Sequence, residues 1–417
     1  MPPIMGAGAF VMAAFTQIPY ESIIASAALP ALLYFLSVAF FVRIEAKRAG
    51  LPPMPSSGET LGSAFKKGGA SFVIPIALLI GMLVAGFTPT YAAVYGILAV
   101  IASSWLTSNP MGPKAVWEAL AMGTRNMILT AVLLCAVGLI VNVIATAGVG
   151  NTFSLMISDW AGGNILIAIV LIGLASLILG MGLPVTAAYI VLATLSAPAL
   201  AGMISDRFVI DALVQGNLPE TARAVLMLGA PEAMEAIMAP MPRGEATALI
   251  NGLPLEVASP LRDLVVSPTA ATAALLSAHM IVFWLSQDSN VTPPVALAAF
   301  TAAAIAKAPA MATGFASWKL AKGLYIVPVL FAYTPLLSND WGAVLTVFAF
   351  AVVGIYALAG ALQGCLEAPL GWPMRLAVGA AGIACLWPGS LLINLAGVLA
   401  TVALLGLNLR KPQVAVA

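Results

Sequence analysis

The sequence predicts an all-α polytopic membrane protein, and its composition and its repeated apolar runs lead to that prediction. Of the 417 residues, 62% are hydrophobic and only 8% are charged, and the mean hydropathy is +1.06. A soluble domain carries about 25% charged residues because its surface faces water. Long apolar runs recur along the whole chain, which excludes a soluble domain held by a single anchor.

Each apolar run is expected to be a helix, since a span needs about 20 mostly apolar residues to cross the hydrocarbon core. In chain order the runs are Ile23–Val42, Phe72–Phe87, Tyr91–Trp105, Met127–Ala147, Ile165–Leu179, Thr269–Leu285, Pro294–Ile305, Gly323–Tyr333, Ala343–Leu362, Met374–Trp387 and Leu391–Leu407. Several are short or broken by glycine and proline, which is typical of re-entrant or discontinuous helices.

Basic residues indicate the orientation, because lysine and arginine concentrate in cytoplasmic loops. The loop after the first run and the loop two spans later carry Arg43, Lys47, Arg48, Lys66, Lys67, Lys114 and Arg125. Both loops are therefore expected on the cytoplasmic side. Lys+Arg (17) nearly balances Asp+Glu (16), which argues against a nucleic-acid partner.

The sequence gives no support for catalysis or for a metal cluster. Cys135, Cys365 and Cys385 lie far apart in apolar stretches, so we interpret them as small hydrophobic residues rather than as ligands or disulfide partners. There is no serine-histidine-acid set, phosphate loop or histidine pair. The single histidine, His279, lies in an apolar run, where it is either a proton relay or, as is more common, a packing residue.

Residues 205–263 differ from the rest, since charged residues recur there between leucines and alanines with a loose helical spacing. A charge at the bilayer centre costs about 2.5–3.5 kcal/mol on insertion scales. We therefore expect an aqueous or interfacial subdomain of short amphipathic helices. It is either a solvated insertion or a docking surface for a partner.

The two halves of the chain resemble each other. Pro2–Phe10 is followed by Pro19 and Tyr34, and Pro293–Phe300 is followed by Pro309 and Tyr325, at a nearly constant offset. Interrupted helices at corresponding places in two halves are the best sequence indication of a secondary transporter's binding site. Paired prolines unwind a helix, and the backbone groups released at bilayer depth must line a cavity or bind a ligand.

Two motifs in the second half have the same character. Gly180–Tyr189 places a glycine-proline break and small polar residues between two apolar stretches, which predicts a re-entrant hairpin rather than a kinked span. Gln287–Pro294 places polar groups at the break of a helix that otherwise spans. Asp288, Asn290 and Thr292 offer oxygen ligands to a hard cation.

These motifs closely resemble those of the membrane permease of TRAP (tripartite ATP-independent periplasmic) transporters, and in particular the fused permease of the TAXI subfamily. Gly180–Tyr189, Asp288–Phe300 with the preceding His279, Pro2–Phe10, and Gly314–Pro328 with Tyr333 carry the resemblance, which covers most of the chain except residues 205–263.

The resemblance implies an inverted-repeat elevator-type transporter in the bacterial inner membrane, driven by a sodium gradient. A periplasmic TAXI-type solute-binding protein would deliver the substrate, usually an organic acid. One sodium site would use Gly182, Pro184, Thr186, Asn290, Thr292 and Pro293, with Gly180 and Asp288 beside them. The mirrored site would use Pro3, Met5 and Gly6. No cofactor beyond the coupling ion is expected.

In the family the first Pro-Pro motif lies well inside the chain, so the resemblance also implies a truncated start, with a small permease subunit or a fused amino-terminal region missing. The expected divisions are 1–150 for the remainder of the first repeat, 151–204 for the second-repeat helix and hairpin, 205–263 for the insertion, 264–335 for the discontinuous helix and following span, and 336–417 for extra helices. The alternatives are the membrane subunit of an ATP-driven importer and a non-transporting scaffold. Proton coupling and the identity of the substrate stay open.

Overall fold

The computed structural model describes residues 7–52, 60–107, 109–233, 236–294 and 296–410, and the elements in these ranges are helices. Six helices are long and apolar enough to cross a membrane within that part of the chain, or seven if a pair bent by 73° forms one further span. The bent pair is Leu134–Thr146 and Val149–Ala161. The predicted all-α polytopic membrane protein is thus confirmed.

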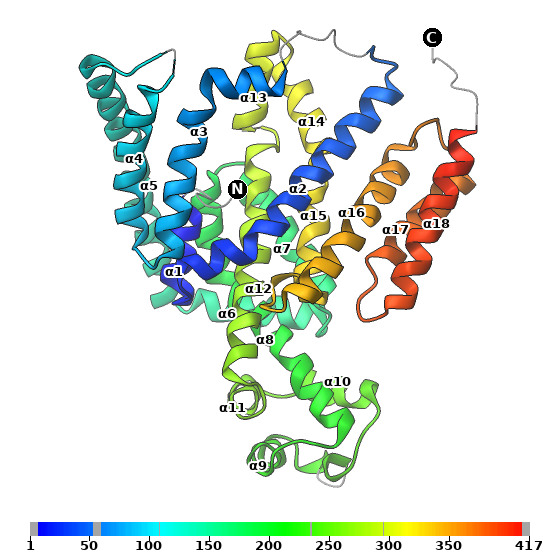
Figure 1. Cartoon of the computed structure of the whole chain (residues 1–417). Coiled ribbons are helices and arrows are strands. Elements are labelled where there is room, and N and C mark those ends of the chain that lie inside the picture. Colours follow the sequence, from blue (N-terminus) through cyan, green and yellow to red (C-terminus); the bar gives the residue numbers. More distant parts are fainter. Residues whose placement is uncertain (1–6, 53–59, 108, 234–235, 295, 411–417) are drawn as a thin grey trace.

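The helices of the membrane region, shown in Figure 1, follow one another with short connections. They are α1 (Ala7–Thr16), α2 (Tyr20–Arg48), α3 (Leu61–Val84), α4 (Pro89–Ser104), α5 (Pro113–Thr146), α6 (Val149–Ala161), α7 (Ile165–Gly180), α8 (Val185–Gln215), α12 (Pro268–Ser286), η3 (Gln287–Asn290), α13 (Leu297–Ala306), α14 (Ala310–Leu320), α15 (Gly323–Tyr333), η4 (Pro335–Leu337), α16 (Trp341–Gln363), α17 (Trp372–Cys385) and α18 (Leu391–Leu409).

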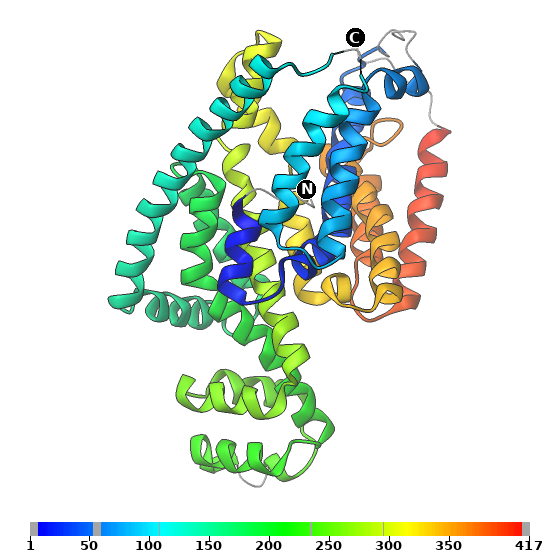
Figure 2. The ribbon, with the colours of Figure 1, turned by 60° about the vertical axis from the view of Figure 1, so that its left-hand side comes forward.

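Two parts of the chain have the same backbone plan in opposite directions. The half-helix α1 starts at mid-height and descends before α2 returns to the top, whereas α13 starts at mid-height and ascends before α14 and α15 descend (Figures 1 and 2). Gln17 and Lys307 end the half-helices in the left-handed region, with φ of 56° and 53°, two residues before Pro19 and Pro309. The landmarks of the sequence repeat are therefore landmarks of an inverted structural repeat.

The centre of the molecule is the pair α8 and α12, which pack along each other. Both helices are largely buried and contribute Tyr189, Leu192, Met280 and Phe283 to the main apolar core. The half-helix α1 packs against them, because a Cβ on Gly8 would lie 2.4 Å from Cε2 of Phe283. Glycine at this position allows the first half of the chain to approach the second.

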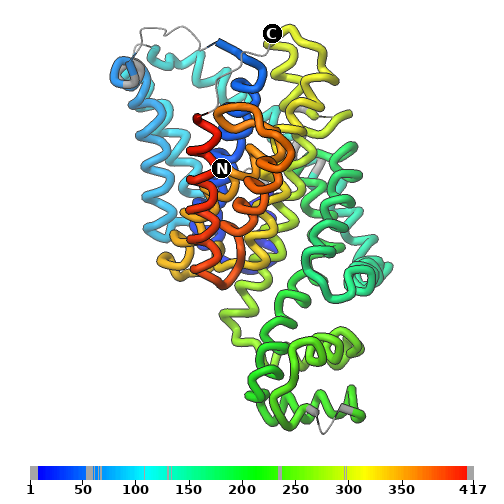
Figure 3. The backbone as a smooth tube through the Cα atoms, turned by 90° about the vertical axis from the view of Figure 1, so that its right-hand side faces the viewer, coloured from blue at the N-terminus to red at the C-terminus, as the bar shows by residue number. Residues whose placement is uncertain are grey.

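The helix α8 continues past Ser205 without a break, so the expected boundary at residue 204 falls inside a helix. Residues 205–265, which we call the extension, comprise the end of α8 and the short helices α9 (Glu220–Gly229), α10 (Arg243–Asn251) and α11 (Leu255–Val265). The extension has its own apolar cluster, which includes Leu213, Leu226 and Leu261, and it projects beyond the membrane helices (Figure 3).

Of the last three helices, α16 packs along α2, α17 packs on α16, and α18 packs on α17. A third apolar cluster joins Phe41 and Ile44 of α2 to Leu366 and Val378. Arg43 and Lys47 form ion pairs with Glu367, and Gln363 donates a hydrogen bond of 2.8 Å to the carbonyl of Phe41. These contacts hold α16 and α17 on α2.

Candidate functional site

The span formed by α12 is broken at bilayer depth, at the place where the sequence predicts it. After η3, residues 291–294 form turns, Ala296 has a φ of 29°, and α13 begins only at Leu297. Pro293 and Pro294 cannot donate backbone hydrogen bonds, so the helical ladder cannot continue through them. The amide groups of Val291 and Thr292 instead fold back on the carbonyl of Asp288, at 3.0 and 2.9 Å.

The predicted hairpin meets this break. The arm α7 ends at Gly180, residues 181–184 turn, and α8 begins at Val185. A Cβ on Gly180 would lie 3.2 Å from the Cα and Cβ of Ser289, so the end of α7 rests directly on η3. The arm α8 also packs against η3. The structure thus brings together the two motifs that the sequence singles out, although they are a hundred residues apart.

The predicted residues differ in how they are placed. Asp288 and Thr292 are 1% and 5% exposed, and Pro293 is also buried. Asn290, between them in the chain, and Thr186, at the start of α8, are partly buried, whereas Gly182 and Pro184 at the hairpin tip are exposed. No atom lies within 4 Å of where a Cβ on Gly182 would be. Pro3, Met5 and Gly6, expected to form the mirrored site, lie outside the described residues.

Three buried oxygens at the break, and one on the facing arm α7, have no hydrogen-bond partner in the described part of the chain. They are Oδ2 of Asp288, Oγ of Ser289, Oγ1 of Thr292 and Oγ of Ser176. Ser176 lies on α7 one turn before Gly180, on the face that meets α12 and η3, because Gly173 on the same face contacts Leu285. Buried polar atoms are normally paired, since each unpaired one costs about 1–3 kcal/mol. The cluster therefore has the chemistry of an oxygen-ligand site.

The other carboxylate oxygen of Asp288 is held by a chain of hydrogen bonds. Tyr325 donates its hydroxyl proton to Oδ1 at 2.6 Å, and the same hydroxyl accepts the indole N–H of Trp318 at 2.9 Å. Both residues come from the α14–α15 segment. One oxygen of the carboxylate is thus held by protein, and the other is buried without a partner among the described residues.

Sequence reasoning missed four of these participants, namely Ser176, Ser289, Trp318 and Tyr325. A signal was present for Ser176, because it is the only polar side chain in the predicted run Ile165–Leu179. Tyr325 carried a signal as a repeat landmark, but its contact with Asp288 joins residues 37 positions apart and depends on tertiary packing.

His279 belongs to packing rather than to the site. Its Nδ1 is 2.9 Å from the hydroxyl of Tyr189, and its ring meets those of Tyr189 and Phe15 edge-on. The residue is 6% exposed and lies more than two turns before η3. With a buried hydrogen-bond partner of its own, His279 is a satisfied core residue.

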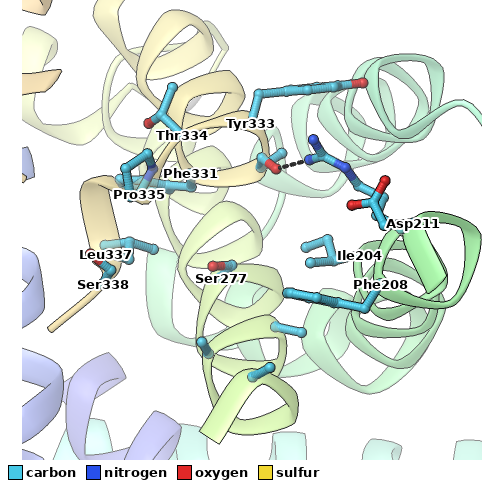
Figure 4. Close-up of a pocket in the computed structure, with 15 residues that line it drawn as sticks. Ile204, Phe208, Asp211, Ser277, Phe331, Tyr333, Thr334, Pro335, Leu337 and Ser338 are labelled. Carbon is cyan, nitrogen blue, oxygen red and sulfur yellow. Dashed lines mark hydrogen bonds between the residues drawn. The ribbon is translucent and has the colours of Figure 1, made fainter. Parts of the chain in front are cut away.

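A cavity of about 300 Å³ lies where α8 leaves the membrane region, between α8, α12, α15 and η4 (Figure 4). Arg207 borders it, donates a hydrogen bond of 2.7 Å to the carbonyl of Ala332, and places its guanidinium 5.0 Å from the centre of the Tyr333 ring. Tyr333 in turn accepts the backbone N–H of Leu166 at 3.1 Å. These contacts join both hairpin arms to the end of α15.

Comparison with known proteins gives one match. The family model described as tripartite ATP-independent periplasmic transporter, DctM component, matches residues 1–337. The match includes the hairpin, the extension and the broken helix, and it ends at η4, before α16 to α18. No curated protein and no solved structure matches the chain.

Proposed function

The chain belongs to the DctM component family of tripartite ATP-independent periplasmic transporters, and on that premise we propose that it imports an organic acid with a sodium gradient, by an elevator movement. The family identifies a multi-pass transport permease that works with a periplasmic solute-binding protein and a small subunit. The observation that carries the rest of the proposal is the cluster of unpaired, buried oxygens at the broken helix.

The cluster favours a small monovalent cation. Its ligands are oxygens, which suit a hard cation better than a soft one. Asp288 is the only carboxylate among them, so its single negative charge balances one positive charge. No group of three or more histidine, cysteine, aspartate or glutamate side chains converges within the described residues. Sodium fits these conditions better than calcium or a transition metal.

The inverted repeat supports alternating access. Related halves of opposite direction allow one site at mid-depth to open to either side when one part moves against the other. The unpaired oxygens lie on α7, on η3 and on the turn that follows η3, whereas α2 is joined by ion pairs to the loop between α16 and α17. We therefore propose that the hairpin moves with the broken helix, and that α2 with the last three helices is the stationary part.

Charge indicates the orientation in the bacterial inner membrane. The loops α2–α3, α4–α5 and α13–α14 lie on one face, at the top of Figure 1. This face, which we call the basic face, carries Arg43, Lys47, Arg48, Lys114, Lys307, Arg375 and Arg410. The extension lies on the opposite face, and residues 205–263 contain eight acidic and four arginine residues. In line with the positive-inside rule, we propose that the basic face lies in the cytoplasm and the extension in the periplasm, where a TAXI-type binding protein would dock.

Uptake measurements test the proposal. The chain is expressed with its solute-binding protein and small subunit in proteoliposomes, and entry of labelled carboxylic acids is followed under an imposed sodium gradient. We expect uptake that requires sodium and persists without ATP. Uptake driven by a proton gradient alone would reject sodium coupling. Uptake that requires ATP hydrolysis would indicate an ATP-driven importer subunit, and no uptake with any gradient would indicate a scaffold.

A further inference from the structure

Two lysines lie where α14 meets α15, next to the end of α16, with no carboxylate of the described residues paired to them. The helices α14 and α15 form one candidate span, Ala310–Tyr333, and Lys319 and Lys322 flank its midpoint. Neither side chain forms an ion pair or a hydrogen bond within the described ranges. Arg375 and Lys319 add repulsion at Lys322. Lysines at the edge of the hydrocarbon core extend toward water or toward an anionic group, because lipid does not solvate them.

A cavity is present at that position. It has a volume of about 480 Å³ and is lined by Trp318, Lys319, Lys322, Tyr325, Ile326 and Leu362. Its polar groups are two ammonium groups, a phenol and an indole, and it contains no carboxylate. Two donors of positive charge beside aromatic and aliphatic walls suit an anionic group on a partly apolar molecule.

The inverted repeat shows that the fold itself does not require these lysines. The corresponding stretch of α2 is Ala27–Leu33, which consists of alanines, leucines and a proline. That stretch forms the same part of a spanning helix without any charge. The lysines thus occur only in the second repeat, which also contains the broken helix with its unpaired buried oxygens.

We propose that the Lys319–Lys322 cavity binds the carboxylate of the transported acid, and that Tyr325 couples this anion site to the cation at Asp288. Tyr325 lines the cavity and donates its hydroxyl proton to Asp288. A cation on the free oxygen of Asp288 therefore acts on the group that faces the anion. This inference rests on the proposed function and names where its substrate binds.

Thiol labelling tests the cavity without requiring transport. Lys319→Cys and Lys322→Cys are introduced separately into a Cys135→Ser background and placed in phosphatidylcholine nanodiscs. The remaining lysine should make the anionic sulfonatoethyl methanethiosulfonate react about tenfold faster than its cationic trimethylammonium analogue. Leu345→Cys, at an exposed apolar position on α16, is the control and should react with neither. Equal rates with both reagents would overturn the inference.

Protection experiments identify the anion and the coupling. Succinate should slow labelling of Lys319→Cys at constant ionic strength, whereas phosphatidylglycerol in the nanodisc should not. Protection by the anionic lipid alone would show a lipid phosphate site and reject the substrate role. Sodium should strengthen protection by succinate about fivefold, and Tyr325→Phe should remove that sodium effect. A sodium effect that survives Tyr325→Phe would reject the coupling.

These outcomes are separable from failure of the proposed function. If uptake by the complete transporter does not depend on sodium while the charge-selective labelling and the succinate protection are observed, the proposed sodium coupling fails and the anion site stands. If uptake depends on sodium while the two reagents label equally, only the anion site fails.

Discussion

Replacement of Asp288 by asparagine should abolish sodium binding while preserving the local fold. Asparagine has the size of aspartate, and its carbonyl oxygen can still accept the hydroxyl proton that Tyr325 donates at 2.6 Å. Only the negative charge is lost. At an effective dielectric constant of about 20, a carboxylate and a cation 4 Å apart attract each other by about 4 kcal/mol. A loss of that size weakens affinity about 1,000-fold.

The measurement is thermal unfolding of the full chain in nanodiscs, in sodium chloride and in choline chloride at equal ionic strength. Sodium should raise the Tm of the unaltered protein, because a ligand that binds only the folded state stabilises it. Asp288→Asn should show no sodium-dependent shift at concentrations that saturate the unaltered protein. Asp159→Asn, at an exposed position on α6, is the control and should keep the full shift. A full shift in Asp288→Asn would refute the assignment of the cation to this carboxylate.

Two further predictions compare matched positions. Gly180→Val should destabilise the chain by about 1–3 kcal/mol, because a Cβ at this position would lie 3.2 Å from Ser289. Gly182→Val is the matched control and should cost far less, because its side chain meets open space. Equal Tm values for the two variants would contradict the close contact of α7 with η3. Arg262→Gln should destabilise the extension by about 3–5 kcal/mol, because it breaks a mostly buried, two-contact ion pair of 2.7 and 2.9 Å with an aspartate of α8. Arg243→Gln is the matched control: it breaks an exposed ion pair and should cost about 0–1 kcal/mol. Hydrogen exchange of the extension measures the loss of stability in both variants. Similar losses in the two would show that burial does not decide the strength of these ion pairs.

The fold class could be predicted because lipid imposes one strong rule, that a span be apolar and hydrogen-bonded within itself. The run Ile165–Leu179 corresponds to α7 to within a residue. Prediction was weaker where a helix extends beyond the apolar part. The helix α5 begins at Pro113, well before the predicted Met127, since its first turns carry charges that a search for apolar runs excludes.

The candidate site could be predicted only where polarity interrupts an apolar run. Asp288 and Thr292 stood out beside paired prolines, and the structure buries both. The sequence predicts that Lys319 and Lys322 flank a span, because the predicted run begins after them at Gly323, whereas the structure includes both in the candidate span Ala310–Tyr333. The contact of Tyr325 with Asp288 could not be predicted, because it depends on how α15 packs against η3.

The separation of Asp288 from Lys322 bears on how binding of a cation could be coupled to binding of an anion. Asp288 is buried without a cationic partner, and Lys322 lies without an anionic one, although Tyr325 contacts the first and lines the same cavity as the second. A direct ion pair between them would satisfy both groups and leave no demand for ligands. Because Tyr325 lies between them, the carboxylate of Asp288 and the ammonium group of Lys322 can each be neutralised by a ligand of opposite charge. If only the cation or only the anion is bound, the protein group for the missing ligand keeps its charge uncompensated. Moving that charge across the membrane is costly in a medium of low dielectric constant. Binding of both ligands compensates both groups. Under the proposed function, that difference in cost would be a physical basis for moving the cation and the acid together.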